Sequence, residues 1–384
     1  MTTTTHEALV QRVHFHQQHK GVLSARTHAE TAENPPGPCR SASEHKLACW
    51  PSPLSAKAVP INLYFSSRRR MDHWIAYDSN KFNPSILDFD PQRRTAILIH
   101  GFLGSGQDFI FRQMEDYLLQ WRDMNVIVVG WEQGCNNFAF YQQAAVNTEY
   151  AAIEIRNALT QLMKYWMDRG VDPNQWGYTH IIGHSLGAHV AGQVGKMMQR
   201  YNNFHINRIT ALDPAEPCFE TQEPLRLSRR DALLVDVIHS DGARTKNQAF
   251  GLLNPIGDVD FYLNGGTLQP ECKVGNLMYR RRKREMMNYP NVLVHLLDKG
   301  VCRHFRSVVL FVESLKRALD GRCNLWSHPW QYSSNTDQAR AIFRTPCNEN
   351  NCVEVGINAE RYKYQPQSST FYVRTDLRRP GCAF

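Results

Sequence analysis

One stretch reads Tyr178-Thr-His-Ile-Ile182, then Gly183-His-Ser-Leu-Gly187, then Ala188–Met198: an apolar run, a serine between two glycines, and a segment with small residues that suits a helix. A serine at a sharp strand-to-helix turn has a strained backbone, and side chains two residues before and after it would collide. The turn exposes the Ser185 hydroxyl at the carboxyl edge of a sheet. It also puts the Leu186 N–H at the positive end of a helix, where it can stabilise an oxyanion. The pattern favours a serine nucleophile over a glycine-rich turn with an incidental serine.

Short apolar runs alternate with helix-length segments from Val59 onward. Between two of these runs, Ala144–Met167 repeats apolar residues at helical spacing. Strand–helix–strand alternation implies a mostly parallel sheet with helices on both faces, so the sequence predicts an α/β fold. The runs predicted as strands are Ile61–Phe65, Ala96–His100, Val126–Trp131, Tyr178–Gly183, Ile209–Leu212 and Leu233–His239.

The composition limits the class of protein. The chain has 384 residues, 42% of them hydrophobic, and a formal net charge of +8, which suits a basic globular protein with a large core. No window of 18 consecutive apolar residues suggests a spanning helix, and no periodic repeat is visible. Residues 1–50 lack a sustained apolar pattern, and we expect a poorly ordered extension or pro-region there. Residues 51–384 then form a single domain.

Ten cysteines are many for a reduced cytosolic enzyme of this size. The spacings Cys39 to Cys49, Cys272 to Cys302 and Cys347 to Cys352 suit locally closed disulfides in an oxidising compartment, and buried free thiols are the alternative. Without a C-x-x-C motif, zinc-ribbon and thioredoxin interpretations lose their main support. Residues 1–30 show no signal-peptide pattern and no N-x-[ST] site occurs, which argues against export. We nevertheless expect a secreted protein.

A serine hydroxyl becomes a strong nucleophile only beside a base that an acid orients. Asp213 ends an apolar run and precedes Pro214, which places its carboxylate at the same sheet edge as Ser185. Asp236 lies inside a predicted strand and Asp241 in a Ser-Asp-Gly turn. The spacing favours Asp213 and leaves the other two open.

Sixteen histidines compete for the role of base. His184 lies in the serine turn itself, and His100 ends an earlier strand. His239 ends a strand and has the position of a buried structural residue. His304 follows Cys302 after a long loop, where a base is expected, but each histidine alone is more often structural.

A second oxyanion donor is predicted where the run Thr95-Ala-Ile-Leu-Ile-His100 ends in Gly101-Phe102. Gly101 lets the backbone approach a substrate, and the Phe102 N–H would donate. A simple strand-ending glycine is the alternative.

Several segments together resemble the pancreatic lipase family, which includes lipoprotein, hepatic and endothelial lipases and the phospholipases A1. The resemblance runs from about residue 59 to 355 and implies an α/β-hydrolase fold. It also implies that Ser185 is the nucleophile, Asp213 the acid and His304 the base, with Phe102 and Leu186 as oxyanion donors. The segments are Ile99-His-Gly-Phe102, Gly183-His-Ser-Leu-Gly187, Leu212-Asp-Pro-Ala-Glu-Pro-Cys-Phe219, Val235-Asp-Val-Ile-His239 and Cys302-Arg-His-Phe-Arg-Ser307.

The resemblance also bears on cofactors and further domains. Glu223, Arg226 and Asp231 match the family's calcium loop, but Ser228 stands where pancreatic lipase has an acidic ligand, and fewer carboxylates bind a hard cation more weakly. We expect no required cofactor and leave calcium open. Because few residues follow Cys352, we expect no C-terminal β-sandwich domain and no colipase partner.

By resemblance, Cys272 and Cys302 bound a lid over residues 273–301. Its full length, with an untruncated Ala243–Gly257 loop, favours neutral glycerides over phospholipids. Within it, the basic run suits adsorption to anionic lipid or a sulfated polysaccharide, although a solvated loop or a processing site fits equally well. No aromatic-interleaved basic fold suggests nucleic acid. The run comprises Arg280, Arg281, Arg282, Lys283 and Arg284.

Together these observations predict a serine carboxylic ester hydrolase that releases fatty acids from triacylglycerols at a lipid–water interface. A phospholipase A1 or a lipase of mixed specificity is one alternative. A catalytically inactive lipid-binding protein, as insect yolk proteins are on this fold, is another, and the intact Ser185, Asp213 and His304 argue against it.

Overall fold

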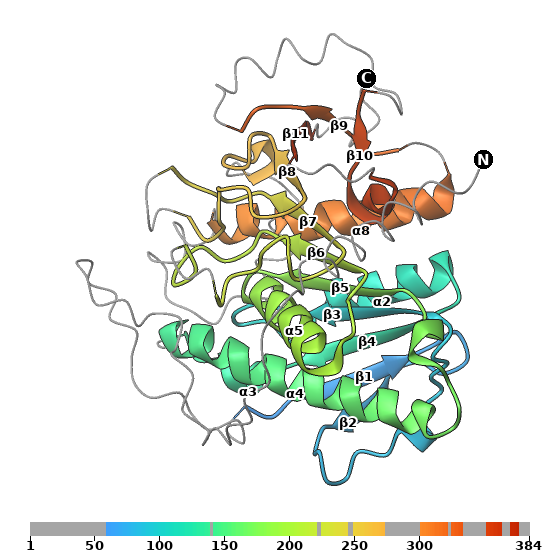
Figure 1. The fold of residues 1–384 in the computed structure, drawn as a ribbon. Coiled ribbons are helices and arrows are strands. Elements are labelled where there is room, and N and C mark those ends of the chain that lie inside the picture. Colours follow the sequence, from blue (N-terminus) through green and yellow to red (C-terminus); the bar gives the residue numbers. More distant parts are fainter. Residues whose placement is uncertain are drawn as a thin grey trace, which may run out of the picture.

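The structure is a computed structural model, and it describes residues 59–138, 141–220, 224–244, 249–272, 300–321, 324–332, 351–362 and 369–375. Over these residues one sheet of eleven strands runs through the molecule in the order β10-β9-β11-β8-β7-β6-β5-β3-β4-β1-β2 (Figure 1). The seven central strands, from β11 to β4, are parallel, and antiparallel pairs flank them on both sides. The predicted α/β fold, of the α/β-hydrolase type, is confirmed.

The six predicted strands and both predicted helices are present. The strands are β1 (Asn62–Ser66), β2 (His73–Ala76), β3 (Arg94–Ile99), β4 (Met124–Gly130), β5 (Thr179–His184), β6 (Arg208–Leu212), β7 (Leu234–His239), β8 (Val259–Leu263), β9 (Trp326–Pro329), β10 (Val353–Glu354) and β11 (Ser369–Val373). The α-helices are α2 (Phe109–Trp121), α3 (Glu132–Cys135), α4 (Tyr141–Met167), α5 (Leu186–Asn202) and α8 (Arg306–Asp320). Short 3₁₀ helices span Pro84–Ile86 (η2), Pro173–Gln175 (η4), Pro270–Cys272 (η5) and Gly356–Arg361 (η6).

Helices cover the sheet on both faces, which is why its central strands read as continuous apolar runs. In β3, Ile97 and Ile99 pack into the core shared with α4 and α5, while Ala96 and Leu98 face the core shared with α2 and α8. This alternation follows from the two-residue period of a strand. Figure 1 shows α4 and α5 lying together over one face. None of the described helices is long and apolar enough to cross a membrane.

A disulfide joins Cys272 to Cys302, as the spacing predicted, with the two Cα atoms 5.7 Å apart. Cys352 is also disulfide-bonded, and the thiol of Cys135 is buried and free. The remaining predictions about the N-terminal extension, most of the lid and its basic run fall on residues 1–58 and 273–299, outside the described residues.

Candidate active site

Ser185 occupies the sharp turn between β5 and α5, with φ 57° and ψ −120°. Three backbone bonds hold this strained residue. Its N–H donates to the Leu212 carbonyl at 3.0 Å, and its carbonyl accepts from the Ala188 N–H at 3.1 Å and the Ala215 N–H at 3.3 Å. Only 6% of the residue is exposed. The turn thus fixes Ser185 against the end of β6 and the segment that follows it.

The glycines around the turn are required by close backbone contacts. A Cβ on Gly183 would lie 2.3 Å from the Gly187 carbonyl oxygen, and one on Gly187 would lie 2.3 Å from the Ile99 carbonyl oxygen. A Cβ on Gly101 would lie 2.6 Å from the Ser185 Cβ. The absence of side chains at these glycines therefore lets the turn and the end of β3 touch, which brings the Gly101-Phe102 segment to the serine.

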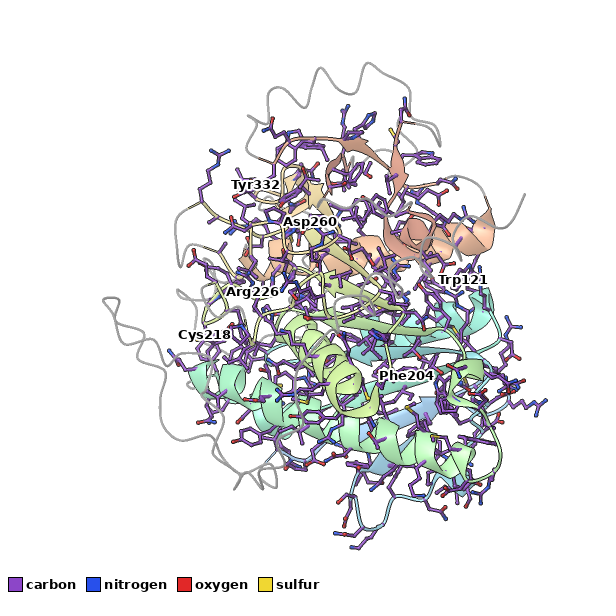
Figure 2. The ribbon with its side chains drawn as sticks, viewed as in Figure 1. Trp121, Phe204, Cys218, Arg226, Asp260 and Tyr332 are labelled. Carbon is purple, nitrogen blue, oxygen red and sulfur yellow. A yellow bond between two sulfur atoms is a disulfide. The ribbon has the colours of Figure 1, made fainter. Side chains whose placement is uncertain are left out.

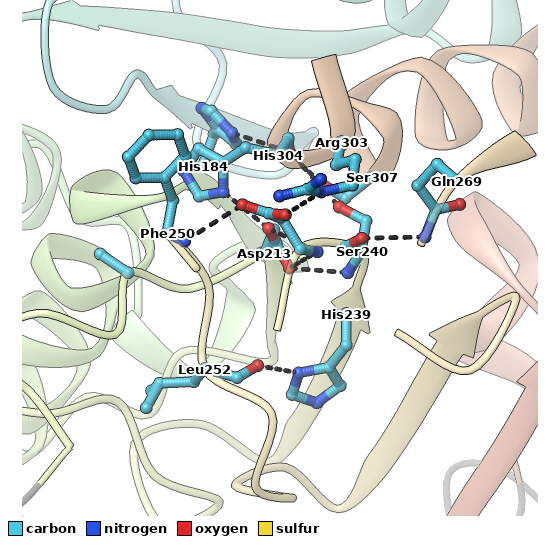
Figure 3. A network of polar contacts seen from close by, with 12 residues as sticks. His184, Asp213, His239, Ser240, Phe250, Leu252, Gln269, Arg303, His304 and Ser307 are labelled. Atoms are coloured by element: carbon cyan, nitrogen blue, oxygen red, sulfur yellow. Dashed lines mark hydrogen bonds and ion pairs between the residues drawn. The ribbon is translucent and has the colours of Figure 1, made fainter. Parts of the chain in front are cut away.

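Asp213 follows β6 in the left-handed region (φ 47°), and its buried carboxylate lies at the carboxyl edge of the sheet. Oδ2 accepts from His304 Nδ1 at 2.6 Å (Figure 3). Oδ1 accepts from the backbone N–H of Ser240 at 2.7 Å and of Asp241 at 3.1 Å. These bonds stabilise the ionised carboxylate and fix its orientation toward His304.

His304 lies immediately before α8 and is 7% exposed. Its ring centroid is 4.7 Å from that of His184, the residue before Ser185, and its carbonyl accepts from His184 Nε2 at 3.4 Å. Burial, reinforced by the neighbouring His304, lowers the pKa of His184 well below its ordinary value, so that ring stays neutral. The structure thus brings Asp213 and His304 into direct contact and both to the serine turn.

The competing acids have other partners. Asp236 in β7 accepts two hydrogen bonds from Arg208, at 2.7 and 2.9 Å, and the pair is fully buried. Asp241 lies beside Asp213 and accepts from Arg303 Nε at 2.5 Å. Burial and the charge of Asp213 raise the pKa of Asp241 to about 6, although Arg303 opposes the shift. Asp241 is therefore the only one of the two that adjoins the Asp213–His304 pair.

Two other candidate histidines have structural contacts. His239 Nδ1 lies 2.7 Å from the Leu252 carbonyl, and its Nε2 lies 2.9 Å from Asp260 Oδ1. Burial lowers the pKa of His100, whose Nε2 accepts from the Trp131 N–H at 3.1 Å. Both rings join strands to loops at the edge of the sheet.

The predicted oxyanion segment leaves β3 in a tight turn, closed by a bond from the Gly104 N–H to the Gly101 carbonyl at 3.2 Å. The Phe102 ring packs edge-on against Tyr141, with centroids 5.1 Å apart. Leu186, which carries the other predicted donor, is fully buried at the first position of α5. The first N–H groups of a helix have no partner within it and suit an oxyanion.

No sequence pattern indicated Glu132, which fastens this segment to α3. Its Oε1 accepts from Ser105 Oγ at 2.8 Å and from the Gly106 N–H at 2.7 Å. The carboxylate fills the space over Gly130, where a Cβ would lie 2.7 Å from Oε1. Burial alone would raise the pKa of Glu132, but these bonds and one from its own N–H lower it. Glu132 therefore holds the loop as an anion.

We expect Glu132→Ala to lower kcat by about 10- to 100-fold with little change in KM, less than the roughly 10²–10³ lost with an oxyanion donor itself. The reason is that the loop carrying Phe102 loses two of its bonds. Hydrolysis of a soluble short-chain ester measures both constants. Glu132→Gln keeps an accepting oxygen and should retain most of the activity; equal losses in the two variants would contradict this role.

Of the residues matched to a calcium loop, Glu223 lies outside the described residues. Asp231 is buried, and its carboxylate accepts from the Ser228 N–H at 2.8 Å and from Ser228 Oγ at 2.9 Å. The Arg226 guanidinium donates to the Glu220 carbonyl at 2.8 Å. Among the residues that the structure describes, no cluster of three or more His, Cys, Asp or Glu side chains could hold a metal ion.

Comparison with known proteins identifies relatives over most of the chain. A family model described as Lipase matches residues 27–380. Pancreatic triacylglycerol lipase of Myocastor coypus is 33% identical over 335 residues, covering 86% of this chain and 67% of that protein. The same-named protein of Homo sapiens is 34% identical over 329 residues, covering 84% and 65%. Pancreatic lipase-related protein 2 of Mus musculus is 32% identical over 304 residues, covering 78% and 58%.

The chain therefore spans about two thirds of the length of the pancreatic triacylglycerol lipases it matches. Among solved structures, XC6422 from Xanthomonas campestris, a serine hydrolase without a lid, aligns with a TM-score of 0.29 and 11% identity. That alignment covers 61% of this chain and 84% of the other.

Proposed function

This chain belongs to the lipase family, a family of carboxylic ester hydrolases, and we propose that it releases fatty acids from acylglycerols through Ser185, Asp213 and His304. One observation carries the proposal: His304 Nδ1 lies 2.6 Å from a buried Asp213 carboxylate, beside the turn that presents Ser185. An acid that orients a histidine next to a strained serine is the arrangement that serine hydrolysis needs.

The proposed mechanism follows from this geometry. Because Nδ1 bonds to Asp213, Nε2 of His304 is the nitrogen that takes the Ser185 proton as the serine oxygen attacks the ester carbonyl. The N–H groups of Phe102 and Leu186 donate to the oxyanion. His304 then returns the proton to the departing alcohol, and a water molecule, activated in the same way, releases the fatty acid from Ser185.

We propose triacylglycerol as the preferred substrate, acted on at a lipid–water interface. The names of the most similar relatives and the full length of the segment between Cys272 and Cys302 support this preference. Exposed apolar side chains near the oxyanion segment, Leu103 at 44% and Phe138 at 52%, suit contact with lipid. The Leu103 N–H donates to the Cys135 carbonyl, so α3 lies directly against this segment.

Titration of fatty acid released from emulsified triacylglycerol and from phosphatidylcholine tests this preference. Faster release from triacylglycerol is expected, because a full-length lid admits neutral glycerides. Deleting residues 276–296 should then raise phospholipid cleavage relative to triglyceride cleavage, and an unchanged ratio would contradict the role of the lid. Faster release from phosphatidylcholine would make the protein a phospholipase A1, and lipid binding without release would make it an inactive binding protein.

The basic run, Arg280–Arg284, is proposed to attract anionic lipid or a sulfated polysaccharide, at about 1 kcal/mol for each basic residue near an anionic surface. Replacing all five residues by Gln should weaken binding to phosphatidylserine vesicles. The variant should also elute from a heparin column at a lower salt concentration. If neither measurement changes, the run has another role. We propose that the protein is secreted, since disulfides such as Cys272–Cys302 persist in oxidising compartments.

A further inference from the structure

Three polar side chains on one face of α5 hold the backbone of the segment that follows residue 223. His189, Gln193 and Lys196 are spaced four and three residues apart, so they share a helix face. His189 Nδ1 accepts from the Leu227 N–H at 3.2 Å, and Gln193 Nε2 donates to the Leu225 carbonyl at 3.0 Å. Figure 2 labels Arg226 on this segment, beside α5. The helix that begins after Ser185 thus binds residues 224–231, which we name the α5 loop.

The ammonium group of Lys196 is the only charge in this row, and three oxygens of the α5 loop surround it. Nζ donates to the Arg226 carbonyl at 2.6 Å and to the Pro224 carbonyl at 3.0 Å, and it lies 3.5 Å from Asp231 Oδ2. An ammonium has three N–H donors, so this set uses all of them. Burial lowers the pKa of Lys196, and the charge of Asp231 opposes that shift.

The sequence of α5 allows this close contact. A Cβ on Gly195 would lie 2.1 Å from the Asp231 carbonyl oxygen, and one on Gly192 would lie 2.8 Å from Asp231 Oδ2. Asp231 is 3% exposed, and Ser228 supplies its two other hydrogen bonds. The loop therefore packs tightly on the helix. The Asp231 carboxylate contacts Lys196 and Ser228 and is almost fully shielded from solvent.

Two of these oxygens, the Arg226 carbonyl and Asp231 Oδ2, belong to residues that the family resemblance matched to a calcium loop. Calcium takes six to eight oxygen ligands at about 2.3–2.6 Å. An ion bound to both the Arg226 carbonyl and Asp231 Oδ2 would share these oxygens with the Lys196 ammonium and would be repelled by its positive charge at close range. Ser228 adds no negative charge to offset the repulsion. These described residues therefore do not fit a calcium ion.

We propose that the Lys196 ammonium takes the place of a bound cation and stabilises the α5 loop through its positive charge. The conformation of this loop is then independent of calcium. The helix begins after Ser185 and the loop belongs to the chain that follows Asp213, so the internal cation links the segments that carry both residues. The proposal goes beyond ester hydrolysis and stands whether or not the protein hydrolyses lipid.

Calcium binding by the unmodified protein tests the proposal first. Thermal unfolding should give the same Tm in EDTA and in excess calcium chloride, and terbium should show no saturable luminescence that calcium displaces. A calcium-induced rise in Tm that disappears in Asp231→Asn would overturn the proposal. A rise that persists in that variant comes from a site elsewhere and leaves the α5 loop without a metal, as proposed.

Substitution of Lys196 tests whether its ammonium stabilises the α5 loop. Lys196→Met should lower Tm by about 3 °C or more, because two carbonyls and a buried carboxylate lose their partner. Lys164→Met is the matched control: that ammonium lies 2.9 Å from Asp168 Oδ1 on the exposed surface of α4, and Tm should change by less than about 1 °C. Lys196→Arg keeps the charge and should keep both Tm and indifference to calcium. Equal Tm changes in the two methionine variants would count against the proposal.

A double variant, Lys196→Ala with Ser228→Asp, removes the internal cation and restores a second carboxylate. We expect its Tm to rise with calcium and terbium luminescence to become saturable and calcium-sensitive. A folded double variant, judged by its circular dichroism, that ignores calcium would contradict the exchange of one cation for the other. Should either variant fail to fold, the calcium titration of the unmodified protein still decides.

Discussion

Ser185→Ala is expected to lower kcat for ester hydrolysis by about 10⁶-fold, the scale of loss when a serine hydrolase loses its nucleophile. The alanine methyl fits the same strained turn, because it is the Ser185 Cβ that lies against Gly101 and the hydroxyl is not among these contacts. Fatty acid release from emulsified triacylglycerol, followed by continuous titration, measures the change.

An unchanged Tm would show that the Ser185→Ala protein is folded, as its buried position and unaltered Cβ predict. Retention of more than about 1% of the activity, far above the loss expected for a nucleophile, would mean that another group attacks the ester. Binding of the variant to triacylglycerol emulsion should be unaffected, since the serine hydroxyl contributes to chemistry and not to adsorption.

Asp213→Asn is expected to lower kcat by about 10⁴-fold, because an amide in place of the carboxylate stabilises the wrong tautomer of the histidine. His304 Nδ1 lies 2.6 Å from Oδ2, so an amide nitrogen there would meet an N–H group, or the proton would move to Nε2 and block the base. The pH dependence of kcat and the rate with a short-chain ester measure the effect.

Asp241→Asn is the matched control, because the Asp241 carboxylate adjoins that of Asp213. It keeps the backbone N–H bonds from Asp241 to Asp213. It loses the charge that pairs with Arg303 and one of the two hydrogen bonds that the carboxylate accepts, from Arg303 Nε or from the Phe250 N–H. We expect a loss of about 10-fold or less, the scale of a charge acting on a neighbouring group rather than on the reacting atoms. If kcat fell as far in Asp241→Asn as in Asp213→Asn, the role of the acid would have been assigned to the wrong residue.

The sequence predicted the fold where the constraint is local. The serine turn is recognisable because a Cβ on Gly183 would collide with the Gly187 carbonyl only four residues away, so the glycine spacing appears in the sequence. Strands β3 to β7 are recognisable because burial on two faces makes them mostly apolar. Strands β9 and β10 are short, and β11 inserts between β8 and β9 through pairing across distant segments. No local sequence pattern predicts such a pairing.

Residue spacing predicted the site as a set of candidates, and the family resemblance named Asp213 and His304 among them. Asp241 lies at the same sheet edge as Asp213, and the contact of Asp213 with His304, across 91 positions of sequence, is information that spacing alone lacks. Glu132 was not predicted because its carboxylate bonds to Ser105 and Gly106, 26 to 27 residues earlier in the chain, and no local pattern indicates such a contact. Lys196 escaped notice because polar residues at helical spacing are normally a solvated face. Contacts between distant segments therefore carry the information that spacing lacks.

The most direct test of Ser185 as a nucleophile activated by His304 is covalent capture. A p-nitrophenyl alkylphosphonate should inactivate the protein with release of one p-nitrophenolate per chain, and peptide mass spectrometry should find the phosphonyl group on Ser185. His304→Ala should slow this labelling strongly, since the base would be absent. No adduct, an adduct on another residue, or labelling at an equal rate in His304→Ala would contradict the account.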